Sequence, residues 1–227
     1  MLSLLAACVF FLAIHVVISG SPLRRAIVAT TGEPAYLGLF SLLSLGGMVW
    51  LVIAYARASR AWLWTAPVAL RWAAPPLVLV AFLFVVIGLT TPSPTAAGGE
   101  SRLDRDDAAR GILRVTRHPF LWGVALWAAT HLALNGDVAS LTLFGSLLML
   151  ALIGPLLIDG KRRRAFGPKW SRFAAQTSNV PFAAIAAGRN QLRLGEIGTW
   201  RVLAALAAWA LVLSTHRWMF GVSALPR

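Results

Sequence analysis

The sequence has little charge, and most of the charge that it has is of one sign. Only 13% of its 227 residues are charged, whereas a water-soluble domain usually carries about 25%. Eight residues are acidic, against 21 Lys and Arg. Cysteine is nearly absent: the single residue, Cys8, can form neither an intrachain disulfide nor a multi-cysteine metal site. This composition excludes an ordinary soluble domain and a disulfide-stabilised one.

Long apolar runs are what the sequence has instead. Hydrophobic residues make up 58% of the chain, and its mean hydropathy is +0.73. A run of about 20 apolar residues can cross a hydrocarbon core of about 30 Å, and it must be helical there because unpaired backbone amides are too costly in lipid. We therefore predict an all-α integral membrane protein, a six-transmembrane-helix bundle forming a single domain over residues 1–227. The predicted spans are about 1–19, 35–56, 74–91, 119–134, 138–158 and 202–219.

The distribution of Lys and Arg predicts the orientation of these spans. Loops 20–34, 92–118 and 159–201 hold sixteen of the 21 cations, and the connections on the other side hold five. The positive-inside rule makes the richer side cytoplasmic, which places both termini on the non-cytoplasmic side of a multi-pass protein in a bacterial inner (plasma) membrane. The first span has no Lys or Arg before Ala7, which disfavours a signal peptide cleaved near Ser19.

A basic segment, "KRRRAFGPKW" (161–170), follows the fifth span directly. A nucleic-acid site can contain such a pattern. Its position beside a span favours contact with anionic membrane lipid instead, so we expect no nucleic-acid partner. Phe166, Trp170 and Phe173 fall on one helical face, which predicts a cytoplasmic amphipathic segment lying on the membrane. Between the fourth and fifth spans, "NGD" (135–137) predicts a tight turn and an antiparallel helix pair.

No Asp, Glu, Lys or Arg interrupts the predicted span interiors, apart from Arg217 at an outer fringe, but histidines occur within them. An ionisable residue in a span is a functional candidate, because burying it is expensive. His15 and His131, as neutral imidazoles, could ligate haem iron or another metal; alternatively, each only hydrogen-bonds a neighbouring helix. On straight helices they differ in depth by about 12 Å. At the cytoplasmic mouth, Arg117 and His118 are candidates to hold an anionic headgroup or a haem propionate.

Four stretches together resemble the NnrU family of bacterial membrane proteins, whose name comes from denitrification genes, and the related plant zeta-carotene isomerases. They are "FLAIHVVISGSPLR" (11–24), "GILRVTRHPFLWGVALWAATHLALNGD" (111–137), "NVPFAAIAAGRNQL" (179–192) and "HRWMFGVSALP" (216–226). The resemblance implies haem b held by His15 and His131, with His118 matching the "RHP" histidine that is not an axial ligand. It further implies redox-gated cis–trans isomerisation of a hydrophobic polyene, or chemistry linked to nitric oxide and denitrification.

Two other interpretations stay open. "RHPFLWG" (117–123) and "FGPKWSRF" (166–173) resemble segments of isoprenylcysteine carboxyl methyltransferases, with Trp and Phe where those enzymes have tyrosines. That resemblance implies S-adenosylmethionine bound at loops 102–118 and 161–193. The third interpretation is a non-enzymatic membrane partner of a denitrification or respiratory complex.

Overall fold

The computed structural model describes residues 1–18 and 22–225, and within these ranges it is helical without a β-strand. The all-α prediction is therefore confirmed; Ser19, near the alternative cleavage site, lies outside the described residues. The α-helices are α1 (Leu2–Ala13), α2 (Pro22–Thr31), α3 (Glu33–Ala56), α4 (Val68–Thr90), α5 (Pro119–Leu134), α6 (Val138–Gln176), α7 (Ala183–Ala186) and α8 (Thr199–Phe220). A π-helix, η1 (Ile14–Ile18), follows α1, and three short 3-10 helices are η2 (Glu100–Asp104), η3 (Gly111–Arg114) and η4 (Leu194–Glu196).

Four helices are long and apolar enough to cross a membrane: α3, α4, α6 and α8. The bent pair that joins α1 and η1 to α2 would make a fifth crossing. At 16 residues, α5 is about 24 Å long, shorter than the hydrocarbon core of about 30 Å. Each predicted span coincides with a helix, yet length and composition support four or five crossings, so the predicted count of six is not confirmed.

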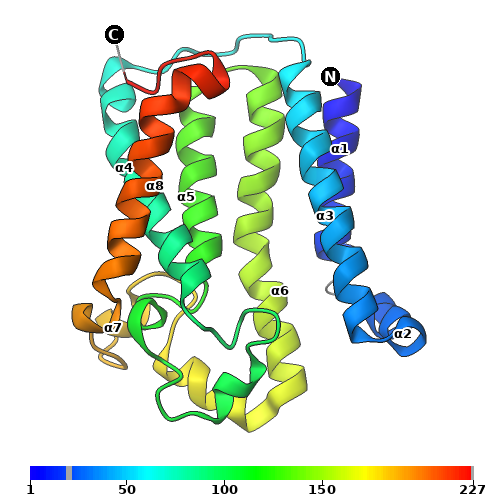
Figure 1. Ribbon diagram of the computed structural model, residues 1–227, viewed down its shortest axis with the longest axis vertical. Helices are drawn as coiled ribbons and strands as arrows, with labels where there is room; N and C mark the ends of the chain where they lie inside the picture. Colours follow the sequence, from blue (N-terminus) through cyan, green and yellow to red (C-terminus); the bar gives the residue numbers. More distant parts are fainter. Residues whose placement is uncertain (19–21, 226–227) are drawn as a thin grey trace.

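The outer surface of the bundle is apolar, as expected for a multi-pass membrane protein. Leu42 of α3 is 69% exposed, and Leu211 of α8 is 63% exposed. A water-soluble protein rarely shows such side chains in large continuous patches. Figure 1 shows α1, α3, α4, α5, α6 and α8 running roughly parallel, with the start of α1 and the end of α8 at the same end of the bundle. This arrangement agrees with termini on one side of the membrane.

The lower end of the bundle in Figure 1 carries the loops richest in Lys and Arg, and we call it the basic end. There, residues 91–118 form a segment that folds across the bundle, here called the cover segment. The last part of α6 runs beneath it and bends at Gly167 (φ 46°, ψ −117°). Trp170 and Phe173 are 1% and 3% exposed, packed with Leu103 and Ala109 of the cover segment.

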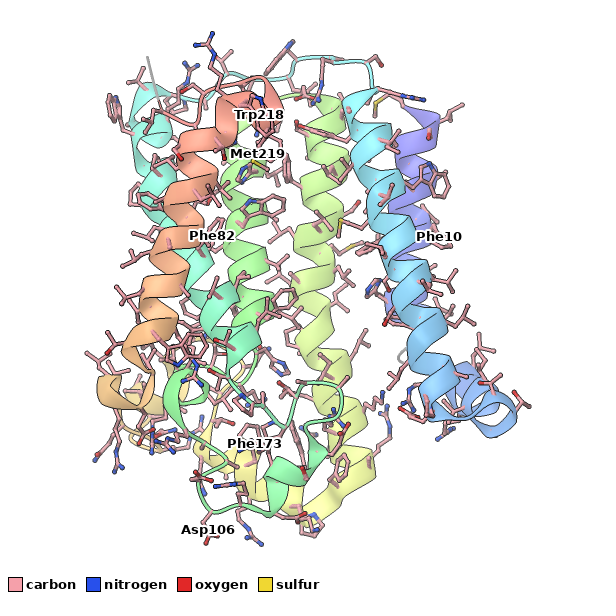
Figure 2. All side chains as sticks on the ribbon, in the orientation of Figure 1. Phe10, Phe82, Asp106, Phe173, Trp218 and Met219 are labelled. Atoms are coloured by element: carbon pink, nitrogen blue, oxygen red, sulfur yellow. The ribbon has the colours of Figure 1, made fainter. Side chains whose placement is uncertain are left out.

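The prediction for this amphipathic segment was therefore half right. Its apolar residues do gather in one cluster, although the bend at Gly167 separates Phe166 from Trp170 and Phe173, and the cluster includes residues of the chain's own cover segment. Figure 2 shows Phe173 between the two elements and Asp106 at the outer tip of the cover segment. The helical elements of the cover segment are the two 3-10 turns η2 and η3.

The opposite end of the bundle contains the predicted turn between α5 and α6. Asp137 caps α6 by accepting hydrogen bonds from the backbone N–H groups of Ala139 (3.0 Å) and Ser140 (3.1 Å). The amide of Asn135 donates to the carbonyl of His131 at the end of α5, at 2.8 Å. The two helices are antiparallel and packed side by side, so the hairpin prediction is confirmed.

Close packing of α4 against α5 depends on glycine. A Cβ atom built on Gly123 would lie 2.7 Å from Cγ2 of Val85 and 2.8 Å from the carbonyl oxygen of Ala81. Small residues let membrane helices approach until their backbones touch, which compensates for the lack of a hydrophobic driving force in lipid. The absence of a side chain at Gly123 therefore sets the distance between these two helices.

We expect Gly123→Ala to destabilise the protein by about 1–3 kcal/mol, because the added methyl group would force α4 and α5 apart. Thermal unfolding of the purified protein in detergent measures the loss. Gly145→Ala in α6 is the matched control, because its added Cβ would meet nothing within 4 Å. Equal melting temperatures for the two variants would contradict the assignment of Gly123 as a packing contact.

Candidate functional site

A buried polar site lies at the basic end, where α5 begins beside α6. His118, the residue before α5, is 3% exposed, and its Nε2 lies 2.7 Å from Oδ1 of Asp159 in α6. Arg117 donates from Nε to both carboxylate oxygens, at 3.1 and 3.0 Å, and from Nη2 to Oδ2. One carboxylate thus receives hydrogen bonds from the two consecutive residues that precede α5.

The charges in this cluster are balanced within the protein. The guanidinium of Arg117 neutralises the carboxylate of Asp159. Burial lowers the pKa of His118, although its hydrogen bond to Asp159 acts in the opposite direction. A neutral His118 then donates its Nε2–H to the carboxylate. The predicted role of Arg117 and His118 in holding a headgroup or a propionate is not supported by this arrangement, because Asp159 occupies the place of such an anion.

The two most specific motifs of the sequence meet around this cluster. The backbone N–H of Arg117 donates to the carbonyl of Ser178 at 2.9 Å, and the indole of Trp122 donates to the side-chain oxygen of Asn179 at 3.2 Å. Phe182 adopts a left-handed conformation (φ 64°), and its N–H bonds the carbonyl of Val115 at 2.8 Å. Segment 111–137 and segment 179–192 therefore form one unit in the folded chain.

A second ion cluster stabilises the basic end. Glu196 accepts hydrogen bonds from Arg114 at 2.8 and 3.1 Å and from the backbone N–H of Gly111 at 2.9 Å. Arg193 lies 3.6 Å from the same carboxylate. The hydrogen bonds from Arg114, supported by those other two groups, lower the pKa of Glu196 to about 2. The carboxylate is thus ionised at any physiological pH and fixes η3 of the cover segment to η4.

His15 lies in the π-helix η1, which follows α1. Its Nδ1 is 2.8 Å from the carbonyl oxygen of Phe11, four residues earlier. The imidazole packs on the ring of Phe11, with 4.3 Å between ring centroids, and against Phe40 of α3 at 5.3 Å. Single-turn π segments in membrane or soluble helices are frequent at functional sites, which keeps His15 a candidate.

His131 has the same local geometry in α5. Its Nδ1 is 2.9 Å from the carbonyl oxygen of Trp127, and its ring lies 4.7 Å from the Trp127 ring and 5.1 Å from the Phe144 ring of α6. Donation from Nδ1 makes Nε2 the nitrogen that carries the lone pair. Metal-ligating histidines use this arrangement, in which one ring nitrogen bonds a backbone carbonyl and the other bonds the metal.

The two intramembrane histidines have different ring partners. His131 contacts Phe144, whose ring lies 5.9 Å from Tyr55 of α3, whereas His15 contacts Phe40 of the same helix. Tyr55 and Phe40 are fifteen residues apart on α3, whereas Phe11, on which His15 packs, lies in one apolar cluster with Phe144. Ligation of one haem by both residues, with the depth difference of about 12 Å expected from the sequence, stays a prediction.

No group of three or more His, Cys, Asp or Glu side chains suited to a metal occurs in the described part of the chain. Each imidazole by itself fits the role of a haem ligand. Each intramembrane histidine has its Nδ1 bonded to its own helix and lies among aromatic rings.

Comparison with known proteins identifies the family of the chain. The model of the family described as NnrU protein matches residues 3–224. The chain belongs to the NnrU family. Among curated proteins it is 29% identical over 106 residues to the 15-cis-zeta-carotene isomerase, chloroplastic, of Arabidopsis thaliana, a match that covers 47% of this chain and 29% of that protein. The Zea mays protein of the same name is 32% identical over 82 residues, covering 36% and 22% respectively.

The matched region is less than a third of the length of either curated relative. No solved structure matches the chain. The predicted relation to the NnrU family and to zeta-carotene isomerases is thus confirmed at the level of sequence.

Asp159 is the residue of this NnrU protein that sequence reasoning missed. It lies one position beyond the predicted end of the fifth span and precedes the basic run. This position indicated a residue exposed to solvent at the membrane surface. A signal was present: Asp159 is the only acidic residue between Asp137 and Glu196, a stretch that contains eight Lys and Arg. A lone carboxylate beside so many cations at a span end predicts an internal ion pair.

We expect Asp159→Asn to destabilise the protein by about 3 kcal/mol, because it leaves the Arg117 guanidinium without a counter-charge in a buried site. Thermal unfolding in detergent at neutral pH measures this loss. Asp106→Asn serves as the control, since Asp106 is exposed at the tip of the cover segment. A melting temperature equal to that of the control would refute the structural importance of this cluster.

The ionisation of Glu196 makes the stability of the folded protein depend on pH. Its folded-state pKa of about 2 lies below the ordinary value of 4.5, so its contribution to stability is complete above pH 4.5 and disappears as the pH falls towards 2. Because solvent screens this cluster, we expect about 1 kcal/mol, or a melting temperature lower by roughly 2–4 °C. Glu196→Gln should lack this part of the acid-induced loss, and a pH profile parallel to that of the unmodified protein would count against it.

Proposed function

We propose that this NnrU protein is a membrane-embedded enzyme that isomerises a cis double bond of a hydrophobic polyene. The observation that carries the proposal is the similarity to two proteins named 15-cis-zeta-carotene isomerase, in a chain whose family model matches residues 3–224. Several apolar helices agree with a substrate that dissolves in the bilayer. Because isomerisation leaves the composition of the substrate unchanged, the enzyme needs only to weaken and restore one double bond.

We assign His131 as the centre of this chemistry. It belongs to the long motif over 111–137, and its imidazole lies between an indole and a phenyl ring inside the membrane region. Flat aromatic rings are apolar and can pack against a planar conjugated chain. The hydrogen bond from Nδ1 to the Trp127 carbonyl holds the ring so that Nε2 faces away from its own helix turn.

Haem b is the cofactor that the family resemblance implies, and we propose His131 as its one protein ligand in this arrangement. When bound, haem would supply the one-electron chemistry that weakens the double bond. His131 would hold the iron, Trp127 would orient the imidazole through its carbonyl, and the neighbouring rings would exclude water.

A single protein ligand favours a second candidate function. Haem iron bonded by one imidazole keeps a coordination position available, and nitric oxide binds at such a position. The separate ring contacts of the two histidines, His15 with Phe40 and His131 with Phe144, support this candidate. It would connect the protein with nitric oxide metabolism in denitrification. The S-adenosylmethionine interpretation and the non-enzymatic interpretation remain predictions.

We also propose the bacterial inner membrane as the location, with α5 as a short sixth crossing and both termini on the non-cytoplasmic side. The positive-inside rule supports this orientation, since the basic end holds most of the cations. The position of the start of α1 and the end of α8 at one end of the bundle agrees with an even number of crossings.

The test combines a spectrum with an activity assay. The full-length protein is expressed with supplied haem, purified, and incubated in liposomes with 15-cis-zeta-carotene, and the products are separated by chromatography. We expect a Soret band and isomerised product, and we expect His131→Ala to lose both by at least about tenfold, because the ligand bond to iron is gone. His216→Ala, near the end of α8, is the control and should keep both.

The remaining outcomes are equally definite. A folded, colourless and inactive preparation would refute the isomerase proposal. A Soret band that nitric oxide shifts, without isomerised product, would favour the second candidate. If His131→Ala keeps the Soret band and the activity and His15→Ala loses both, His15 in the π-helix is the haem ligand instead.

A further inference from the structure

A cavity of about 290 Å³ lies at the basic end, away from both intramembrane histidines. Its walls come from the residues just after α4, from the cover segment and from the start of α8. Arg102, Arg105 and Arg110 of the cover segment line it, together with Arg201 of α8, Asp107 and Glu196. Figure 1 shows these three elements converging below the bundle. The volume is at the lower end of the range for small-ligand sites.

The charges that line the cavity are unbalanced. Four arginines face two carboxylates, and both carboxylates are already paired. Asp107 is bonded by Arg105 at 2.9 Å and lies 3.7 Å from Arg110. Glu196 is held by Arg114 at 2.8 Å. Among the residues that the structure describes, neither Arg102 nor Arg201 has a carboxylate partner, so the cavity keeps a positive excess.

Arg201 also has an unsatisfied donor. Its Nη1 donates to the Ile197 carbonyl at 2.9 Å and its Nη2 to the Thr90 carbonyl at 3.3 Å. Its Nε is buried and has no hydrogen-bond partner in the described chain. A buried donor without an acceptor costs free energy, and native proteins rarely leave one unpaired. The geometry around Arg201 is therefore incomplete without an acceptor from outside the chain.

We propose that this cavity binds the phosphate group of an anionic ligand. A phosphate offers several acceptor oxygens and negative charge, which matches the forked donors of arginine better than a neutral group does. Arg102 is suited to the first contact, because its side chain has no hydrogen bond or ion pair to the described protein. Arg201 supplies the second contact through its buried Nε. The site does not depend on the isomerase proposal.

Two sources of phosphate can reach this place. Trp200 and Leu203 at the start of α8 are 57% and 59% exposed, and a tryptophan at a helix end is typical of the membrane–water interface. A lipid headgroup could therefore enter from the side. Free phosphate in the aqueous phase could enter from the loop side. Both present the same oxygens to the same arginines.

The first arm of the test uses inorganic phosphate. The full-length protein in a neutral detergent is titrated with sodium phosphate against sodium chloride at equal ionic strength, and its thermal unfolding is followed. We expect phosphate to raise the melting temperature with saturation. Arg102→Gln should weaken the apparent affinity by at least about tenfold, because it removes a charge-assisted hydrogen bond without disturbing a protein contact. Arg172→Gln, an exposed arginine of α6, is the matched control and should bind normally.

The second arm uses phosphatidylglycerol in native mass spectrometry. Lipid retained by the unmodified protein and by Arg172→Gln, but lost in Arg102→Gln, assigns the site to a lipid headgroup. Saturable stabilisation by inorganic phosphate without lipid retention assigns it to a soluble phosphate. Arg201→Gln repeats both measurements, and Arg102→Gln decides the result if that variant does not fold. If Arg102→Gln weakens the binding of neither inorganic phosphate nor phosphatidylglycerol, the proposal is overturned.

Discussion

The carboxylate of Asp159 holds the basic end of the protein together. It lies on α6 and receives hydrogen bonds from Arg117 and His118, which come just before α5. Because these two residues end the cover segment, the same carboxylate fixes the start of α5 and the direction of the cover segment. It thereby also helps to position the motif over 179–192, which is hydrogen-bonded to the cover segment. Neutralisation inside the chain is what permits so many cations to gather there without repelling one another.

The part of α6 that extends beyond the apolar region also binds the cover segment. Arg162 donates to the carbonyl of Ala96 at 2.7 Å and pairs with Glu100, while Lys169 pairs with Asp104. Ion pairs therefore attach the cover segment along one side, and Trp170 with Phe173 attaches it by apolar contact. The result is a polar layer built on the bundle, and the arginine-lined cavity lies at the edge of that layer.

Much of the fold could be predicted from the sequence, because lipid permits little besides helices. All six apolar runs are helical, and the "NGD" turn joins α5 to α6 as its capping residues indicate. The partners of basic residues could not be predicted in the same way. Composition treats a cation near a span as lipid-facing, whereas Arg117 and Arg162 have partners far away in the sequence. The candidate histidines were identified by type and depth, but their levels depend on how α1 and α5 are placed against α3 and α6, which no local pattern encodes.

The shortness of α5 has a consequence for the surrounding bilayer. Polar groups stand at both of its ends, His118 at one and Asn135 at the other, so neither end can move into hydrocarbon. In the proposed arrangement with six crossings, a helix of 16 residues fixed in this way would produce hydrophobic mismatch, and lipid in contact with it would thin by several ångströms. Such a protein would be retained preferentially in thinner membranes, and headgroups would approach closer to the bilayer midplane along α5 than along its longer neighbours.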